Sequence, residues 1–308
     1  MRKLIAVALL LAASAPVHAW NNKGHMVTAR LAWKKLTDKQ RTRTVKVLEN
    51  HPHYDEFLAA DRPDGFAEDE WVFLRAATWP DWVRNHHTSD FHHGAWHYIN
   101  YPFVPPGSHV NSADHQPAAN EENIVTRLPY AIAKLKNGNN EDRAVFLCWV
   151  LHLVGDIHQP LHCTALFSER FPHGDQGGNL ALIRIHSSPL KLHAFWDGLL
   201  GKSVSPSSIG RDVKKIEDML EDEPDLIKGD IESHKTIESW AQESLEMAKK
   251  AAYLNGKLKV ANAKDDDDED DVPMAPASYA RNAGRVARIQ VGKAGQRLAD
   301  LLAKSLGE

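Results

Sequence analysis

His-Leu-Val-Gly-Asp-Ile-His-Gln-Pro-Leu-His, residues 152–162, carries the strongest signal in this chain. His152 and Asp156 are four residues apart, a spacing that places two side chains on one face of a helix and within reach of one metal ion. Pro160 is expected to end that helix, so that His162 follows just beyond the break. Two imidazoles and a carboxylate held across a helix end form a ligand set typical of zinc.

The same spacing occurs downstream, where Leu-His-Ala-Phe-Trp-Asp (192–197) places His193 four residues before Asp197. A single buried histidine near an aspartate is usually structural. A second pair with the same spacing, together with the flanking His162, favours a metal centre over that alternative.

Helical patterns dominate the chain on both sides of these motifs, and strand patterns are rare. Helices are predicted over residues 24–36, from a cap at Thr37 and Asp38 to about 50, and over 70–78, 121–136, 141–158, 193–200, 213–220, 237–254 and 279–306. The stretch 81–106 is crowded with aromatic side chains and histidines and is expected to be irregular. Residues 180–185 alternate weakly, as in one strand of a hairpin. The predicted fold class is all-α, with at most a small β-hairpin.

The first 19 residues have the composition of a secretory signal peptide. Arg2 and Lys3 precede a short apolar segment, and small residues occupy the two positions that signal peptidase reads, so cleavage is expected before Trp20. No later apolar run reaches about 18 residues, the length that could span a bilayer. We therefore expect a soluble, secreted or periplasmic monomer without membrane contact, and a single domain over residues 20–308.

The charge of the chain argues against a basic surface that binds nucleic acid. The formal net charge is −4, and loss of Arg2 and Lys3 would make it −6. Such a protein can still hold phosphate through metal ions. The acidic run 265–271, followed by two prolines, predicts a solvated surface loop over 264–276 rather than a calcium site.

Cys148 and Cys163 are the only cysteines. Export would permit a disulfide. However, Cys148 is expected on the same helix as His152, so a bridge requires the chain to fold back after Pro160. Two buried free thiols are the alternative.

Further ligand types occur near the predicted N-terminus of the mature chain. After cleavage, the amino nitrogen and carbonyl oxygen of Trp20 could chelate one metal ion, and His25 could add an imidazole from the first helix. Asp81 follows Ala77-Thr78-Trp79-Pro80, and His97 lies within Trp96-His97-Tyr98. The candidate metal ligands are Trp20, His25, Asp81, His97, His152, Asp156, His162, His193 and Asp197.

These residues resemble the secreted, zinc-dependent single-strand nucleases and 3′-nucleotidases of the S1/P1 nuclease family. The matching segments are Trp20 with Gly24-His25, residues 77–81, 96–98, 152–162 and 177–179, Leu192-His193 with Trp196-Asp197, and Trp240-Ala241 with Glu243-Ser244. They occur in the order of the family and span nearly the whole mature chain. The resemblance implies one mainly helical domain with a trinuclear zinc cluster in a cleft.

The resemblance also implies how the ligands divide among three zinc ions. The first ion would be held by Asp81, His97, His152 and Asp156, and the second by His162, His193 and Asp197. The third would be held by both backbone groups of Trp20 with His25 and Asp156, so that Asp156 bridges two ions. Each site keeps open positions for water or substrate, as catalytic zinc requires.

Substrate-binding roles follow from the same resemblance. Arg84, three residues after Asp81, would join Asp81 in catalysis by gripping the scissile phosphate, with a surface arginine as the alternative. Tyr98 would stack on a nucleobase, with core packing as the alternative. Asn100 stands where fungal members carry an aspartate that reads the base edge, and Asn179 would help to shape the same pocket.

Several neighbours are assigned supporting roles. His158 and Gln159 are expected to support the ligands or the local structure rather than to bind metal, since metal-bound imidazoles need a partner for their other nitrogen. The insert 168–175 and Lys191 depart from the family pattern and are placed at the rim of the site. His51 and His234, in predicted loops, are taken as solvated and idle.

The predicted activity is hydrolysis of single-stranded RNA and DNA to 5′-phosphate products and of 3′-nucleotides. A zinc phospholipase C shares the fold, the terminal tryptophan and the three-metal cluster, but its last ligand is typically glutamate where this chain has Asp197. A non-catalytic periplasmic zinc-binding protein would need neither a bridging carboxylate nor Arg84. Both remain alternatives.

Overall fold

Helix α6 (Asn140–Asp156) runs through the middle of the structure, a computed structural model that describes residues 20–86, 90–265 and 271–306. Asn139 caps its start by accepting a hydrogen bond from the Asp142 amide at 2.8 Å. Every residue from Leu147 to Asp156 is buried. A helix that is apolar all round needs neighbours on every side, and it contacts α1 (Asn22–Lys35), α2 (Asp38–Leu48), α3 (Glu68–Ala76), α4 (Trp79–His86), α5 (Ile124–Asn137) and α11 (Tyr279–Leu306).

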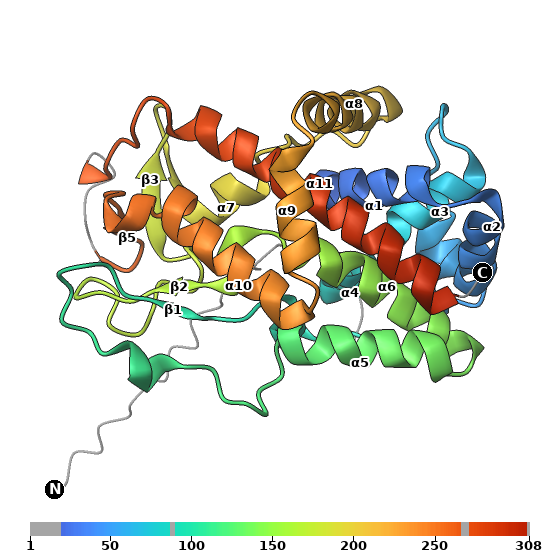
Figure 1. The fold of residues 1–308 in the computed structure, drawn as a ribbon, viewed down its shortest axis with the longest axis horizontal. Coiled ribbons are helices and arrows are strands. Elements are labelled where there is room, and N and C mark those ends of the chain that lie inside the picture. Colours follow the sequence, from blue (N-terminus) through green and yellow to red (C-terminus); the bar gives the residue numbers. More distant parts are fainter. Residues whose placement is uncertain (1–19, 87–89, 266–270, 307–308) are drawn as a thin grey trace, which may run out of the picture.

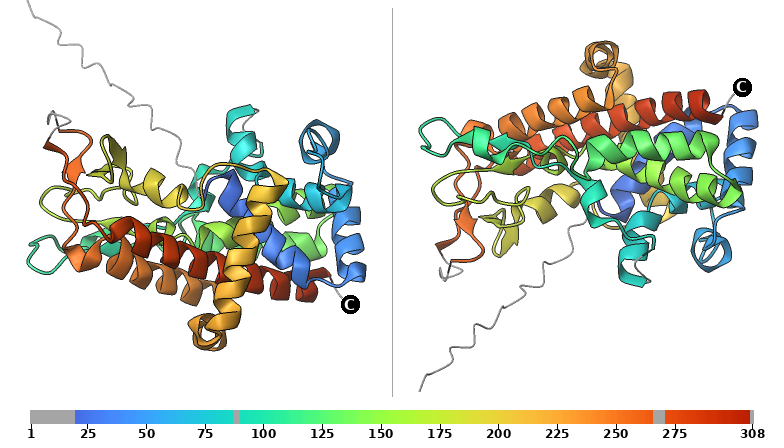
Figure 2. Two further views of the ribbon diagram at one scale, coloured as in Figure 1. Left: turned by 90° about the horizontal axis from the view of Figure 1, so that it is seen from above. Right: turned by 90° about the horizontal axis from the view of Figure 1, so that it is seen from below.

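Helix α11 closes the helical body by packing along α1 (Figure 1). Helices α8 (Pro206–Asp222) and α9 (Asp225–Ser233) contact α11 and project outward from the body in both views of Figure 2. Helix α10 (Ile237–Met247) continues into a π-helical turn, η5 (Ala248–Ala252), and then a 3₁₀ turn, η6 (Leu254–Gly256).

The strands gather at one end of the molecule, to the left in Figure 1. Strands β3 (Ala181–Arg184) and β4 (Pro189–Lys191) form an antiparallel hairpin, and β5 (Ala261–Asn262) pairs with the other edge of β3. Strands β1 (Pro102–Phe103) and β2 (Ala165–Leu166) form a short parallel pair. Short helices connect these elements: η1 (Tyr54–Leu58), η2 (Gly94–His97), η3 (Ser112–His115), η4 (Pro160–Cys163) and α7 (Leu192–Asp197).

Two hydrophobic clusters make up the core, and the predicted metal ligands lie where they meet. The larger cluster lies among the helices around α6, and the smaller one lies among the strands, α7 and η5. Leu161 belongs to the smaller cluster and Cys163 to the larger, so His162 between them stands at the seam.

The all-α class and the small hairpin are confirmed, and α11 has the predicted bounds. The prediction of an irregular stretch from residue 81 is wrong at its start, because α4 extends to His86. Helix α9, strand β5 and the β1–β2 pair were not predicted. Helix α6 ends at Asp156, before the turn that leads to Pro160.

Three further expectations concern the cysteines, the N-terminal segment and the acidic run. The two thiols are free and buried, which excludes the disulfide. The predicted signal peptide, 1–19, and part of the acidic run, 266–270, lie outside the described residues. The segment 264–276 is not wholly a surface loop, since Val272 and Ala275 are buried and Met274 bridges to Arg184 of β3. Within the described part of the chain, no helix is long and apolar enough to cross a membrane.

Candidate metal centre

The last turn of α6 presents His152 and Asp156 on one face, with His152 Nε2 3.1 Å from Asp156 Oδ2. Helix α1 brings in His25, whose Nε2 lies 3.3 Å from Asp156 Oδ1 and whose ring stacks on His152 at a centroid distance of 3.9 Å. This approach requires Gly155, because a Cβ there would lie 2.8 Å from His25 Nδ1. His25, His152 and Asp156 are all fully buried.

A second set of side chains, predicted to hold the first zinc ion, meets on the other side of His152. Asp81 comes from α4 and His97 from the end of η2. His97 Nδ1 lies 2.9 Å from His152 Nε2 and 3.0 Å from Asp156 Oδ2, and His152 Nε2 lies 3.9 Å from Asp81 Oδ1. Asp156 therefore contacts members of both sets, as the predicted bridging role requires.

A third set of side chains comes from η4 and α7 and contains the ligands predicted for the second zinc ion. His162 and His193 have ring centroids 5.0 Å apart, and His193 Nε2 lies 3.4 Å from Asp197 Oδ2. The glycine pair 177–178 allows the close approach, since both residues have positive φ and a Cβ at Gly177 would lie 2.5 Å from the Leu161 carbonyl oxygen.

Backbone carbonyls orient three of the imidazoles. The Nδ1 atoms of His152, His162 and His193 lie 2.9, 2.7 and 2.7 Å from the carbonyl oxygens of Ala77, His97 and Gly177. A carbonyl oxygen only accepts, so each Nδ1 carries the proton and each Nε2 keeps its lone pair for the centre.

Gln159 contacts one of the proposed carboxylate ligands. Its amide nitrogen donates to Asp197 Oδ1 at 2.7 Å, and its amide oxygen accepts from the Leu161 backbone at 2.6 Å. Gln159 therefore orients a carboxylate of the third set and shapes η4, rather than supporting an imidazole. The ring of His158 also faces away from the imidazoles, toward α11.

The start of α1 lies beside Asp197. Trp20 is fully buried, and a Cβ at Gly24 would lie 2.6 Å from Trp20 Cβ. The amide of Asn21 donates to the Asp197 carbonyl oxygen at 3.3 Å. The backbone at Asn21 is thus held next to Asp197, and the chelate by Trp20 stays a prediction.

Burial shapes the protonation of these groups. Burial, reinforced by His152, lowers the pKa of His25, and burial lowers the pKa of His97 to about 4. Against its own burial, the pKa of Asp156 is lowered well below its ordinary value by its contacts with the imidazoles. The pKa of His152, by contrast, is raised, because the charges of Asp156 and Asp81 outweigh its burial. Metal binding needs neutral imidazoles and an ionised carboxylate, a state that the shifts of His25, His97 and Asp156 favour.

Asp197 shows the opposite effect, because burial and the nearby carboxylates of Asp81 and Asp156 raise its pKa well above the ordinary value. Three carboxylates in one buried site repel each other, and a bound cation would reverse that effect. His162 Nε2 and Asp156 Oδ1 are buried and make no hydrogen bond among the described residues. These donors fit zinc, which binds imidazole and carboxylate together.

Among the proposed substrate residues, Arg84 has a side-chain contact with a proposed ligand. Arg84 NH2 is 3.5 Å from Asp81 Oδ1, and the arginine side chain is 11% exposed. Tyr98 is partly buried and Asn100 exposed, on either side of buried Ile99, whose amide donates to the His162 carbonyl oxygen at 2.8 Å. Asn179 donates from its side chain to the Gln176 carbonyl oxygen at 2.8 Å, which closes the turn before β3.

Some residues depart from their predicted surroundings. The insert 168–175 is not confined to the rim, because Phe171 and Asp175 are buried. His51 is buried rather than solvated, with its ring edge-on to Trp79 at 4.6 Å. Gly155 was not identified as part of the site, although a glycine one residue before a predicted ligand is a usable signal of close packing.

Comparison with known proteins gives a consistent result. The family described as S1/P1 Nuclease matches residues 20–307. Endonuclease 4 of Arabidopsis thaliana is 23% identical over 259 residues, which cover 77% of this chain and 76% of the relative. Endonuclease 2 of the same plant is 26% identical over 63% of this chain and 60% of its own length. Nuclease S1 of Aspergillus oryzae is 24% identical over 64% of this chain and 60% of its own length.

Proposed function

The chain belongs to the S1/P1 nuclease family, and we propose that it is a zinc-dependent nuclease that cleaves single-stranded RNA and DNA to 5′-phosphate products and removes phosphate from 3′-nucleotides. The observation that carries the proposal is the convergence of three His/Asp groups on one buried centre, with His152 common to two of them and Asp156 in contact with His25 on one side and His97 on the other. The family match also favours a nuclease over a phospholipase C or a zinc carrier.

Three zinc ions per chain are proposed. Asp81, His97, His152 and Asp156 would hold the first ion, and His162, His193 and Asp197 the second. Trp20 with His25 and Asp156 would hold the third. When bound, zinc supplies Lewis-acid chemistry, because it activates water and polarises phosphoryl oxygens.

The protein groups bind and orient the substrate. Asp81 holds the Arg84 guanidinium close to the ligands, where its paired donors can grip the scissile phosphate. Three ions with three carboxylates leave a formal charge of about +3 in the centre, which would draw a phosphodiester into an otherwise acidic protein.

Single strands are the expected substrate because Tyr98 offers a stacking surface beside His97. A flexible strand can splay one base onto this ring, whereas a duplex must first unstack. Stacking is tolerant of base identity. Asn100 and Asn179 are proposed to line the same base pocket. Export to the periplasm or medium and a monomeric state complete the proposal.

Cleavage of matched single-stranded and duplex oligonucleotides, with analysis of the new ends, tests this function. We expect single strands to be cut to 5′-phosphate fragments, with loss of activity on chelation and recovery with zinc. Asp156→Asn should abolish cleavage, while Asp64→Asn, at an exposed carboxylate, should not. Hydrolysis of phosphatidylcholine without cleavage of RNA, DNA or 3′-nucleotides would instead support a phospholipase.

A further inference from the structure

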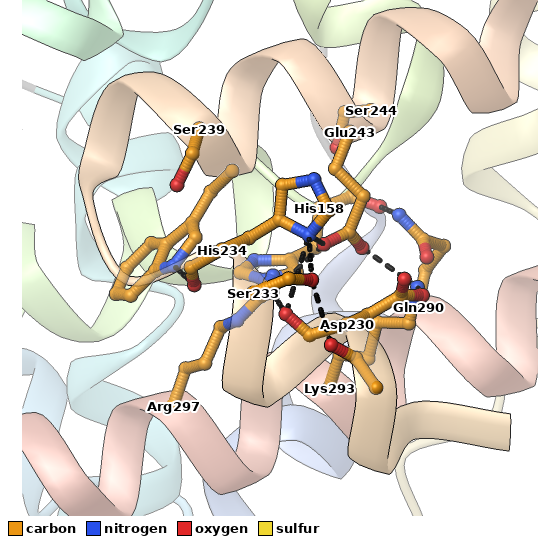
Figure 3. A network of polar contacts seen from close by, with 12 residues as sticks. His158, Asp230, Ser233, His234, Ser239, Glu243, Ser244, Gln290, Lys293 and Arg297 are labelled. Carbon is orange, nitrogen blue, oxygen red and sulfur yellow. Dashed lines mark hydrogen bonds and ion pairs between the residues drawn. The ribbon is translucent and has the colours of Figure 1, made fainter. Parts of the chain in front are cut away.

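A cluster of charged side chains lies around His158, two residues after the proposed ligand Asp156 (Figure 3). It joins Asp230 of α9, Glu243 of α10, and Lys293 and Arg297 of α11. We propose that Arg297, held in place by Glu243, is a positioning residue for the metal centre. Through His158 it fixes the turn 157–159, and this turn sets the separation of Asp156 from His162. The inference rests on the proposed zinc centre.

This cluster is an ion-pair network rather than a fourth metal site. The side chains of Asp230, His234 and Glu243 are close enough to share an ion. However, Lys293 Nζ donates to Glu243 at 2.7 Å and also contacts Asp230, while Arg297 NH2 donates to the other oxygen of Glu243 at 2.7 Å. Two cations already balance the two carboxylates, so a metal ion would have to displace a buried ammonium group.

The hydrogen-bond partners of His158 determine which of its ring nitrogens carries the proton. Its Nδ1 lies 2.7 Å from the Val154 carbonyl oxygen, which can only accept, so Nδ1 carries the proton. Its Nε2 lies 2.7 Å from Arg297 NH1, which can only donate, so Nε2 is the acceptor. Both nitrogens of this fully buried ring are therefore used, and neither is available to bind a metal ion.

Helices α10 and α11 also hold the backbone of the same turn. Ser244 donates to the Ile157 carbonyl oxygen at 2.5 Å, and Gln290 donates to the His158 carbonyl oxygen at 3.3 Å. Carbonyls at the end of a helix lack partners within the helix, and these contacts help to satisfy them. The Ile157 carbonyl oxygen also accepts from the Cys163 thiol at 3.5 Å. The turn is thus anchored at two successive carbonyls and one ring.

The position of this turn matters because ligands of all three groups depend on it. Asp156, one residue before the turn, touches His25 on one side and His97 on the other. Gln159, at its end, orients Asp197, and His162 follows three residues later. Residues outside the ligand shell typically change metal affinity or activity by about 10–100-fold when they fix a ligand in this way.

Two substitutions of His158 separate positioning from simple core packing. His158→Asn keeps a donor near Nδ1 for Val154 but removes the acceptor of Arg297. His158→Gln instead keeps an acceptor near Nε2. We expect His158→Asn and Arg297→Met each to weaken zinc retention against a chelator and to lower kcat on a 3′-nucleotide by about tenfold or more, with little change in KM. His158→Gln should retain most of both.

A double-mutant cycle supplies the decisive comparison. If Arg297 acts through His158, the variant carrying both His158→Asn and Arg297→Met should retain zinc no more weakly than the weaker single variant. Arg285→Met is the matched control, because it removes another ion-paired arginine of α11, on an exposed surface. It should leave zinc retention unchanged.

Three outcomes would overturn the positioning role. The first is additive losses in the cycle, and the second is equal behaviour of the His158→Asn and His158→Gln variants. The third is lowered thermal stability with unchanged zinc affinity and unchanged kcat per bound zinc. If Arg297→Met does not fold, the two His158 variants still decide the question. Zinc retention is measured without substrate, so a failure of the proposed nuclease activity would be visible separately.

Discussion

Gly155 has no Cβ, and this allows a ligand of the metal centre to pack directly against α6. Its position lets the His25 ring lie against α6, because a Cβ would sit 2.8 Å from His25 Nδ1. Alanine normally stabilises a helix relative to glycine by about 0.5–1 kcal/mol. At this position the gain should be outweighed by displacement of His25.

We therefore predict that Gly155→Ala lowers zinc content and reduces nuclease activity by at least about tenfold, while the helical circular dichroism is kept. Gly229→Ala in α9 is the matched control, since no atom lies within 4 Å of a Cβ built there. The control should be as active as wild type and slightly more stable. Full activity of the Gly155→Ala protein would show that His25 is not a ligand.

Asp175 illustrates a role that the sequence concealed. It lies in a polar insert and was predicted at the rim, yet its side chain is buried. It accepts hydrogen bonds from the Leu166 amide at 2.9 Å and from the Tyr253 hydroxyl at 2.8 Å. Burial outweighs these bonds and raises its pKa from 3.8 to about 6.

This raised pKa predicts a pH-dependent stability. Since the folded pKa of about 6 exceeds the unfolded value of 3.8, the contribution of Asp175 is full below 3.8 and is lost as the pH rises through 6. The Asp175→Asn variant has no titrating group at this position, so it does not lose this stability as the pH rises. Its free energy of unfolding, relative to wild type, should therefore rise by up to about 3 kcal/mol between pH 4 and 7.

Urea unfolding of both proteins across this pH range measures the effect. Asp64→Asn, at an exposed carboxylate, controls for the change of residue type. A difference between Asp175→Asn and wild type that does not vary with pH would contradict the assigned shift.

At the scale of elements, the turn at Gly177 decides how η4 meets α7. Gly177→Ala combines a φ of +62° with a Cβ only 2.5 Å from the Leu161 carbonyl oxygen, so η4 must move and carry His162 with it. We predict loss of zinc from the group of His162 and His193, together with most of the activity. Gly107→Ala is the control, because its φ is +91° but no atom lies within 4 Å of the Cβ.

Metal analysis and activity of the two alanine variants would check this prediction. Equal effects at both positions would mean that backbone strain, rather than the contact with Leu161, is responsible. Unchanged zinc content in Gly177→Ala would remove the proposed role of the turn.

Helices with a clear apolar period could be predicted from the sequence, as α11 and the capped start of α2 demonstrate. Helix α4 could not, because it is short and Pro80, a residue that usually marks a break between helices, stands at its start. Proline is tolerated there in the first turn of the helix. The parallel pairing of β1 with β2 depends on contacts between residues about 60 positions apart, which no local pattern reports.

At the scale of the whole molecule, the spacing of ligands within each helix was predictable, but their assembly was not. Four-residue spacing alone places His152 with Asp156 and His193 with Asp197. Asp81, His97 and His25 join the former pair because α4, η2 and α1 pack on α6. The sequence pointed to this only through the family resemblance. The network around His158, from α9 to α11, was indicated only by Glu243, which belongs to a segment that matches the family.

The central claim is that these residues hold three zinc ions for strand cleavage, and a zinc titration of the metal-free protein tests it most directly. Zinc bound per chain and cleavage of single-stranded DNA would be followed together, for a protein that starts at Trp20 and for one with a single asparagine added before it. We predict three zinc ions and full activity for the first, and two zinc ions with strongly reduced activity for the second. Fewer than three ions in the first protein, or identical zinc binding and activity in the two, would contradict this account of the centre.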